Sequence, residues 1–224
     1  MLEAHVVKKR DRFIVDVRLR CPDGDLLVLT GPSGSGKTTV IRALAGLERP
    51  DGGSIRYRQK TWFSARERIL LKARQRKVGY VFQEHTLFPH LNVEKNVAYG
   101  CRDPQRVGEL LAMLRISHLA DKRPQQISGG ERQRAALAQA LASAPDVLLL
   151  DEPFSALDNT TRHRLRLELK RLQHHLRIPI IMVTHDLDEA RQLGDHHIRL
   201  HRGAVTQPAR KANRPALLPD SLPA

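Results

Sequence analysis

The chain has 224 residues, of which 41% are hydrophobic and 28% charged, so it can bury a substantial core and is neither collagen-like nor fully disordered. Its 38 Lys and Arg against 24 Asp and Glu give a net charge of +14, which favours polyanionic neighbours such as nucleic acid, an anionic membrane face or phosphate-rich ligands. No apolar run approaches the roughly 20 residues that cross a bilayer, and no secretory leader precedes the first basic residues, so a cytoplasmic protein is expected.

Short apolar runs alternate with helical stretches, a pattern typical of an α/β fold with a mostly parallel sheet covered by helices. Strands are predicted at 13–20, 25–30, 78–82, 146–150, 179–184 and 197–201. Helices are predicted at 37–47, 104–115, 129–143, 160–177 and 187–193. Val147–Leu150 and Ile180–Val183 are apolar throughout, which predicts strands that are buried on both faces.

Two further segments divide the chain. Residues 84–143 show helical periodicity with little strand signal, which indicates a helical subdomain inserted into the α/β body. From Pro208 onward the chain has four prolines and no apolar periodicity. We therefore predict one domain over residues 1–207 and a loose tail over 208–224.

One stretch, residues 56–77, concentrates the positive charge, with Glu67 as its single acid. A solvated basic surface without a dedicated partner and a surface that faces a polyanion both fit this pattern. The cations are Arg56, Arg58, Lys60, Arg66, Arg68, Lys72, Arg74, Arg76 and Lys77.

A glycine-rich loop fits the pattern G-x-x-x-x-G-K-[ST] and lies between a predicted strand and a predicted helix. Its backbone N–H groups and the helix N-terminus are suited to hold a triphosphate. We expect Lys37 to reach the β and γ phosphates of that ligand and the Thr38 hydroxyl to bind Mg²⁺. The predicted nucleotide-binding residues are Gly31, Pro32, Ser33, Gly34, Ser35, Gly36, Lys37, Thr38 and Thr39.

A pair of acids follows the apolar strand predicted at 146–150. Asp151 is expected to hold Mg²⁺ directly or through water. Glu152 is placed to accept a proton from an attacking water, a role typically worth ~10² to 10⁴ in rate. The alternative for Glu152 is an ordinary surface carboxylate at a strand end.

Ile127-Ser128-Gly129-Gly130-Glu131 opens another predicted helix. The Ser128 hydroxyl and the N–H groups of Gly129 and Gly130 form a second anion site at a helix N-terminus, unless they are only a glycine-rich cap. The segment resembles the signature motif of ATP-binding cassette ATPases. A P-loop NTPase core, with an antiparallel β portion near the N-terminus, is the fold that this resemblance implies.

The resemblance extends over residues 13 to about 203 and includes the expected motifs in order: the loop, Gln83 in Val-Phe-Gln, the signature, the acidic pair, Ser155-Ala-Leu-Asp158, and His185 in Thr-His-Asp. It implies that Gln83 contacts Mg²⁺ and links the site to a transmembrane partner. It also implies that Asp158 communicates across a dimer and that His185 holds the γ phosphate. The implied assembly is a head-to-tail homodimer that sandwiches two ATP molecules between the loop of one subunit and the signature of the other.

The chain departs from the family pattern at three positions. Ile127 stands where Leu is usual, and Glu131 where Gln is common. The aromatic residue that stacks on adenine is also less clear. Phe13 either has that role or is a core residue of its strand.

A single cassette without a fused membrane segment resembles importer ATPases, which work as peripheral proteins on the cytoplasmic face of the cell membrane. Integral membrane permease subunits and a periplasmic or extracellular solute-binding protein are the implied partners, and no nucleic acid is expected. Residues 84–93 resemble the surface that receives a permease coupling helix; internal packing is the alternative.

The transported solute is predicted from the resemblance of four segments to molybdate importers. They are Thr61–Ser64, Arg74–Gln83, Leu87–Leu91 and Asn96–Gly100. Thiamine and sulfate importers share much of this pattern, and a soluble cassette ATPase acting on nucleic acid or ribosomes is a further alternative. Because the chain stops about 20 residues after Gly203, we expect it to lack the C-terminal regulatory domain common in the molybdate type.

Overall fold

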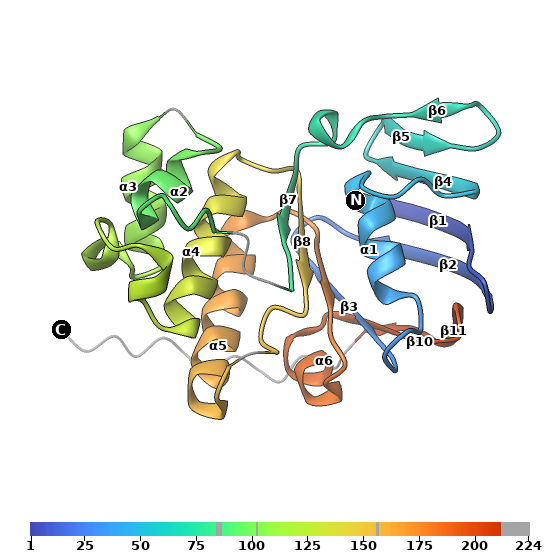
Figure 1. Ribbon diagram of the computed structural model, residues 1–224. Coiled ribbons are helices and arrows are strands. Elements are labelled where there is room, and N and C mark those ends of the chain that lie inside the picture. Colours follow the sequence, from blue (N-terminus) through green and yellow to red (C-terminus); the bar gives the residue numbers. More distant parts are fainter. Residues whose placement is uncertain (84–86, 102, 156, 212–224) are drawn as a thin grey trace.

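The computed structural model describes residues 1–83, 87–101, 103–155 and 157–211 (Figure 1). Within these residues, strands join in one sheet with the order β6-β5-β4-β1-β2-β11-β10-β3-β9-β8-β7. The strands are β1 (Leu2–Lys9), β2 (Ile14–Cys21), β3 (Leu26–Thr30), β4 (Gly52–Tyr57), β5 (Lys60–Ser64), β6 (Ile69–Leu70), β7 (Val78–Val81), β8 (Val147–Asp151), β9 (Ile180–Val183), β10 (His196–His201) and β11 (Ala204–Lys211). The helices are α1 (Lys37–Ala45), α2 (Val93–Ala98), α3 (Pro104–Met113), α4 (Gly129–Ala142), α5 (Asn159–Leu176) and α6 (Leu187–Leu193), with 3-10 turns at Ala73–Gln75, Ser117–Leu119 and Pro124–Gln126.

The parallel half of the sheet contains β10, β3, β9, β8 and β7. All residues of β3, β8 and β9 are buried, which confirms the prediction that such apolar strands are covered on both faces. The carboxyl ends of these strands meet at one edge of the sheet, where α/β proteins commonly bind ligands. The predicted α/β class and P-loop core are confirmed.

The antiparallel half pairs β1 with β2 and β4, β4 with β5, and β5 with β6. Helix α1 packs between this half and the parallel strands, and both contribute to one buried cluster (Figure 1). Most of this half lies outside the predicted strands. In β4, the buried residues Ile55 and Tyr57 alternate with exposed Arg56, but the strand begins with Gly52, Gly53 and Ser54, so its apolar alternation is too short to predict a strand.

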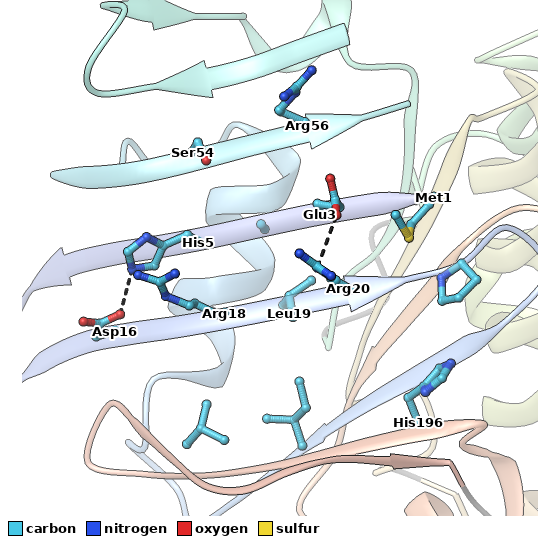
Figure 2. A pocket seen from close by; sticks show the side chains of 14 residues that line it. Met1, Glu3, His5, Asp16, Arg18, Leu19, Arg20, Ser54, Arg56 and His196 are labelled. Carbon is cyan, nitrogen blue, oxygen red and sulfur yellow. Dashed lines mark hydrogen bonds and ion pairs between the residues drawn. The ribbon is translucent and has the colours of Figure 1, made fainter. Parts of the chain in front are cut away.

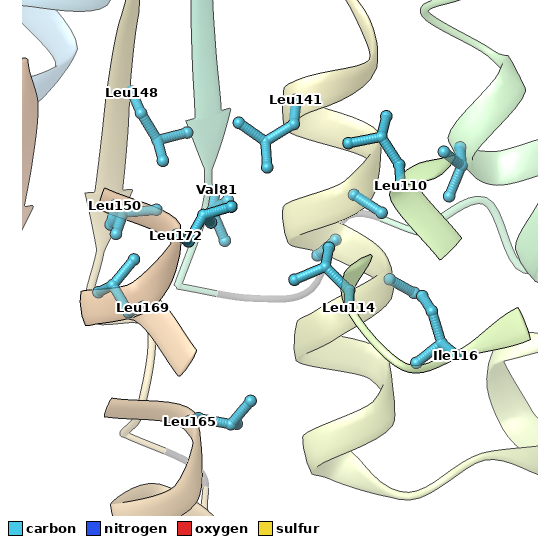
Figure 3. Packing of buried hydrophobic residues seen from close by; sticks show 14 of the residues in the cluster. Val81, Leu110, Leu114, Ile116, Leu141, Leu148, Leu150, Leu165, Leu169 and Leu172 are labelled. Carbon is cyan, nitrogen blue, oxygen red and sulfur yellow. The ribbon is translucent and has the colours of Figure 1, made fainter. Parts of the chain in front are cut away.

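The inserted helical subdomain lies between β7 and β8 and contains α2, α3 and α4. Its core is continuous with the sheet: Leu110 and Leu141 of the helices pack in the same cluster as Leu148 of β8 (Figure 3). One face of α5 is apolar and is buried at Leu165, Leu169 and Leu172. The sequence missed α2, because six residues are too few to show helical periodicity.

The end of the described chain is more ordered than predicted. β11 pairs with β10 up to Lys211, opposite His196, so residues 208–211 belong to a strand instead of the predicted tail. The rest of that tail lies outside the described residues. Among the residues described, no helix has the length and apolar character needed to span a bilayer.

Candidate functional site

The phosphate loop connects the buried strand β3 to α1, in the position that the sequence predicted. Two of its glycines are required by sterics. A Cβ on Gly31 would lie 2.2 Å from the Leu200 carbonyl oxygen, and Gly36 has a φ of 103° with Val15 only 2.8 Å from its Cβ position. Side chains are therefore excluded from both ends of the loop, and its backbone can curl before α1 begins.

Lys37, the first residue of α1, turns its ammonium group back over the loop. Its Nζ donates hydrogen bonds to the carbonyl oxygens of Gly31 at 2.8 Å and Pro32 at 3.0 Å. Burial lowers the pKa of Lys37, while the negative charges of Glu152 and Asp151 oppose that shift. A buried ammonium group that donates to two backbone carbonyls is well suited to exchange these bonds for charge-assisted bonds to phosphate oxygens.

Asp151 ends β8 and is buried beside the loop. Its Oδ2 accepts a hydrogen bond of 3.0 Å from the Tyr80 hydroxyl, whereas its Oδ1 is buried without a hydrogen-bond partner among the residues described. Burial raises the pKa of Asp151. The sequence did not identify Tyr80 as part of this site, because the two residues are neighbours only through the pairing of β7 with β8.

Asp151 Oδ1, which has no hydrogen-bond partner among the residues described, shows whether the site suits Mg²⁺. A buried acceptor atom normally accepts a hydrogen bond or binds a metal ion, so this oxygen is free to bind one. Thr38 and Gln83 line the cleft above the loop, as does Glu152, the residue next to Asp151. Hydroxyl, amide and carboxylate oxygens are the ligands that Mg²⁺ prefers. The predicted set of Thr38, Gln83 and Asp151 therefore fits this ion.

Glu152 and His185 come from two neighbouring strand ends. Glu152 has a φ of 47°, and its backbone N–H donates to the Val183 carbonyl of β9 at 2.9 Å. This turn brings the Glu152 carboxylate within 3.1 Å of His185 Nδ1. The His185 side chain is 63% exposed and that of Glu152 is 17% exposed. The two predicted catalytic residues are thus in contact, although 33 positions separate them.

The cleft above the loop has a volume of about 640 Å³. Besides the loop, Gln83 and Glu152, it is lined by the residues that join β1 to β2, including Phe13. Phe13 is half-buried and lies against the Cβ positions of Gly36 and Gly203, so it borders both the cleft and the core. Arg10, which the sequence did not identify, donates to the Thr39 hydroxyl at 2.7 Å and thereby ties this connection to α1.

The predicted signature lies elsewhere. Ser128 caps α4, and its hydroxyl donates to Glu131 Oε2 at 2.8 Å, while the Ser128 N–H donates to the same oxygen at 2.7 Å. These bonds lower the pKa of Glu131. Gly130 packs against α5, where a Cβ would lie 2.5 Å from Thr161. Neither this segment, which includes Gly129, nor the exposed Asp158, which caps α5 through the Thr161 N–H, lines the cleft above the loop.

A cluster of ion pairs holds the turn that carries His185. Arg166 of α5 donates through Nη2 to Asp186 at 3.1 Å and to Glu189 at 3.0 Å. Glu189, which is 4% exposed, also accepts a 2.6 Å bond from the Thr184 hydroxyl. The cluster fixes α6 and the end of β9 on either side of His185.

Replacing Arg166 with Ala is expected to lower the free energy of unfolding by about 3 kcal/mol, because Glu189 would keep a buried charge without its cation. For a domain of this size, the melting temperature should then fall by roughly 6–12 °C. Thermal unfolding followed by circular dichroism measures the change. Arg164→Ala, at an exposed position of the same helix, is the control and should change stability by no more than about 0.5 kcal/mol. Equal melting curves for the two variants would contradict a structural role for the cluster.

A second and larger cleft, of about 1100 Å³, lies on the face of β1, β2 and β4 (Figure 2). Most of its charges are already paired: Arg20 with Glu3 at 3.2 Å and His5 with Asp16 at 2.9 Å. Its lining contains no residue of the loop, of the acidic pair or of the signature. Despite its size, it has no part in the candidate site.

Known proteins are similar to this chain over most of its length and not only at these motifs. A family model described as ABC transporter matches residues 14–155. The probable sulfate/thiosulfate import ATP-binding protein CysA of Chlorella vulgaris is 44% identical over 199 residues, which are 85% of this chain and 82% of that protein. The sulfate/thiosulfate import ATP-binding protein CysA 2 of Agrobacterium fabrum is 45% identical over 215 residues, which are 91% of this chain but only 61% of that protein.

Solved structures share the fold. A dimeric ATP-binding cassette in a post-hydrolysis state, bound to ADP and Pi, has a TM-score of 0.77 at 31% identity, over 96% of this chain and 100% of that chain. The structure of cbiO1 from Clostridium perfringens, described as part of the ABC transporter complex cbiONQ, has a TM-score of 0.81 at 27% identity, over 93% and 87% of the two chains. The similarity therefore includes the antiparallel strands and the helical insertion as well as the loop.

Proposed function

The chain belongs to the ABC transporter family as one of its ATP-binding cassette ATPases, and from this premise we propose that it powers the import of a small oxyanion across a membrane. The observation that carries the proposal is the meeting of Lys37, Asp151, Glu152 and His185 at one edge of the sheet. Release of inorganic phosphate from ATP by the purified chain, with and without Mg²⁺, tests the hydrolytic part.

Each residue has a defined task in this proposal. Lys37 exchanges its bonds to the loop carbonyls for bonds to the β and γ phosphates. Glu152 accepts the proton of the attacking water, while His185, oriented by its bond to Glu152, contacts the γ phosphate. Bound Mg²⁺ supplies positive charge beside the phosphates, and Thr38, Gln83 and Asp151 are the residues that would hold it.

A groove of about 360 Å³ supports a permease partner. Phe82, Phe88 and Tyr99 line it, and Tyr99 is 70% exposed. The sequence placed the surface for a permease coupling helix at residues 84–93, but Leu87 is buried and residues 84–86 lie outside the described part of the chain. The Phe88 ring packs against that of Tyr99 with centroids 4.4 Å apart and planes tilted by 45°, so the aromatic surface available to a partner helix is centred on the more exposed Tyr99.

The buried residue Asn96 maintains the shape of this groove. Its Oδ1 accepts the Phe88 N–H at 2.7 Å, and its Nδ2 donates to the carbonyls of Phe88, Leu91 and Asn92. The segment preceding α2 is therefore anchored to the helix before any partner binds. A preformed groove costs less ordering on association.

A head-to-tail dimer is the proposed working unit, because the signature does not reach the loop of its own chain. Ser128→Arg places a long cation at the exposed start of α4 and is expected to prevent ATP-driven dimerisation while ATP binding by the monomer persists. Light scattering of Ser128→Arg and of a control variant, each in a Glu152→Gln background and with and without MgATP, measures the association. Ser143→Arg, at the other end of the same helix, is the control and should dimerise. Undiminished dimerisation of Ser128→Arg would exclude the signature from the interface.

The proposed solute is sulfate or thiosulfate, in place of the molybdate that the sequence motifs favoured. The support comes from the names of the Chlorella and Agrobacterium relatives, which agree with the sulfate alternative. No residue at the site distinguishes two divalent oxyanions, because the solute passes through the permease. Uptake of radioactive sulfate by vesicles that contain the chain and its permease, with molybdate as competitor, tests this assignment. A solute-binding protein and a place at the cytoplasmic face of the membrane belong to the same proposal.

A further inference from the structure

The basic stretch that the sequence singled out is only partly used by the fold. Arg58 pairs with Asp23 at 3.1 Å. Arg76 is 1% exposed and donates to the carbonyls of Ala43 and Leu44 at the end of α1. These two cations therefore have structural roles and are not available to an external partner.

Four other cations lie near β6 in the sequence, and we name the surface made by these cations and β6 the basic edge. They are Arg66, Arg68, Lys72 and Arg74. All four are exposed, and none forms an ion pair with another residue of the part of the chain that the structure describes. Glu67, the one acid among them, is also exposed. The basic edge thus keeps a net positive charge when Glu67 is counted.

Aliphatic side chains lie within the basic edge. β6 is the last strand of the sheet and pairs only with β5, through Phe63 with Leu70 and Ser64 with Ile69. Ile69 is 37% exposed and Leu70 is 48% exposed. Two neighbouring aliphatic residues, with cations on both sides of them in the sequence, therefore form an amphipathic surface at the free edge of the sheet.

The basic edge is connected along the chain to the groove for the proposed permease. The chain continues from Arg74 through Lys77 into β7, whose first residues, Val78 and Gly79, line that groove. Figure 1 shows β5 and β6 at the end of the molecule where β7 begins, away from the phosphate loop. A membrane subunit seated in the groove would therefore bring the basic edge toward the bilayer, a step that rests on the proposed function.

We propose that the basic edge binds the surface of a membrane that contains anionic phospholipids. The four cations are attracted to the lipid head groups, and Ile69 and Leu70 enter the boundary between head groups and acyl chains. Nucleic acid is the less suitable polyanion, because Ile69 and Leu70 cannot stack on bases as aromatic side chains do. Binding does not require ATP hydrolysis.

Cosedimentation with vesicles tests the proposal in the full chain. We expect binding to phosphatidylcholine vesicles in which about a quarter of the lipid is phosphatidylglycerol, and no binding to pure phosphatidylcholine. Each Lys or Arg near such a surface is worth about fivefold in partitioning. Changing all four cations of the basic edge to Gln should therefore reduce the partition coefficient at least tenfold, even with screening by salt.

The matched control changes four exposed cations elsewhere to Gln, at Lys122, Arg123, Arg164 and Arg171, and so has the same net charge. This control should bind nearly as wild type does. Ile69→Ser with Leu70→Ser should also weaken binding, and the remaining binding should be more sensitive to salt. Glu152→Gln should bind vesicles normally, which separates this inference from the hydrolytic role.

Two results would overturn the proposal. One is equal loss of binding in the two fourfold variants, which would show a diffuse effect of net charge. The other is tighter binding of the basic edge to a mixed-sequence RNA than to the anionic vesicles, which would assign it to nucleic acid. The melting temperature of each variant establishes that it is folded.

Discussion

Replacing Glu152 with Gln is expected to reduce ATP turnover by about 10²- to 10⁴-fold while ATP binding is retained. Gln has nearly the same shape and can still bond to His185, so the geometry at the end of β8 is preserved. It cannot accept the proton of the attacking water. Single-turnover measurement of phosphate release, together with binding of a fluorescent ATP analogue, separates the two effects.

Glu67→Gln is the matched control, since Glu67 is exposed and far along the sheet from the loop. It should hydrolyse ATP at the wild-type rate. Turnover of Glu152→Gln within a few fold of wild type would remove Glu152 from the role of general base. Glu152 would then be only the partner that orients His185.

Replacing Lys37 with Ala is expected to weaken MgATP binding by about 100-fold or more and to abolish hydrolysis at ordinary ATP concentrations. A hydrogen bond to a charged group contributes about 1.5–3 kcal/mol, and Lys37 is expected to make at least two with the phosphates. Titration calorimetry with MgATP measures the loss. Lys122→Ala, at an exposed position of the helical subdomain, should bind ATP as wild type does.

The stability of Lys37→Ala distinguishes loss of a ligand contact from loss of the fold. Burial lowers the pKa of Lys37, so the folded protein disfavours the charged form of this side chain. Removing that buried charge should not lower the melting temperature in the absence of nucleotide. A large decrease in melting temperature, or normal affinity for MgATP, would contradict the assignment of Lys37 to the phosphates.

Several parts of the fold were hidden in the sequence for physical reasons. The strand β4 begins with two glycines and a serine, and β5 has only five residues, so neither shows a long enough apolar alternation to predict a strand. β6 has only two residues, and α2 has six. The predicted helices, by contrast, are each present to within two residues at either end, because their apolar faces extend over several turns.

The sequence by itself determined the phosphate loop and the acidic pair, because each is built from consecutive residues whose local geometry follows from glycine, strand and helix propensities. It also determined the order of motifs that identifies the family. The tertiary structure decided which residues meet. The contacts of Glu152 with His185, of Asp151 with Tyr80 and of Arg166 with Glu189 join distant segments. They form because parallel strand ends converge and helices pack against them, and no local sequence pattern records that pairing.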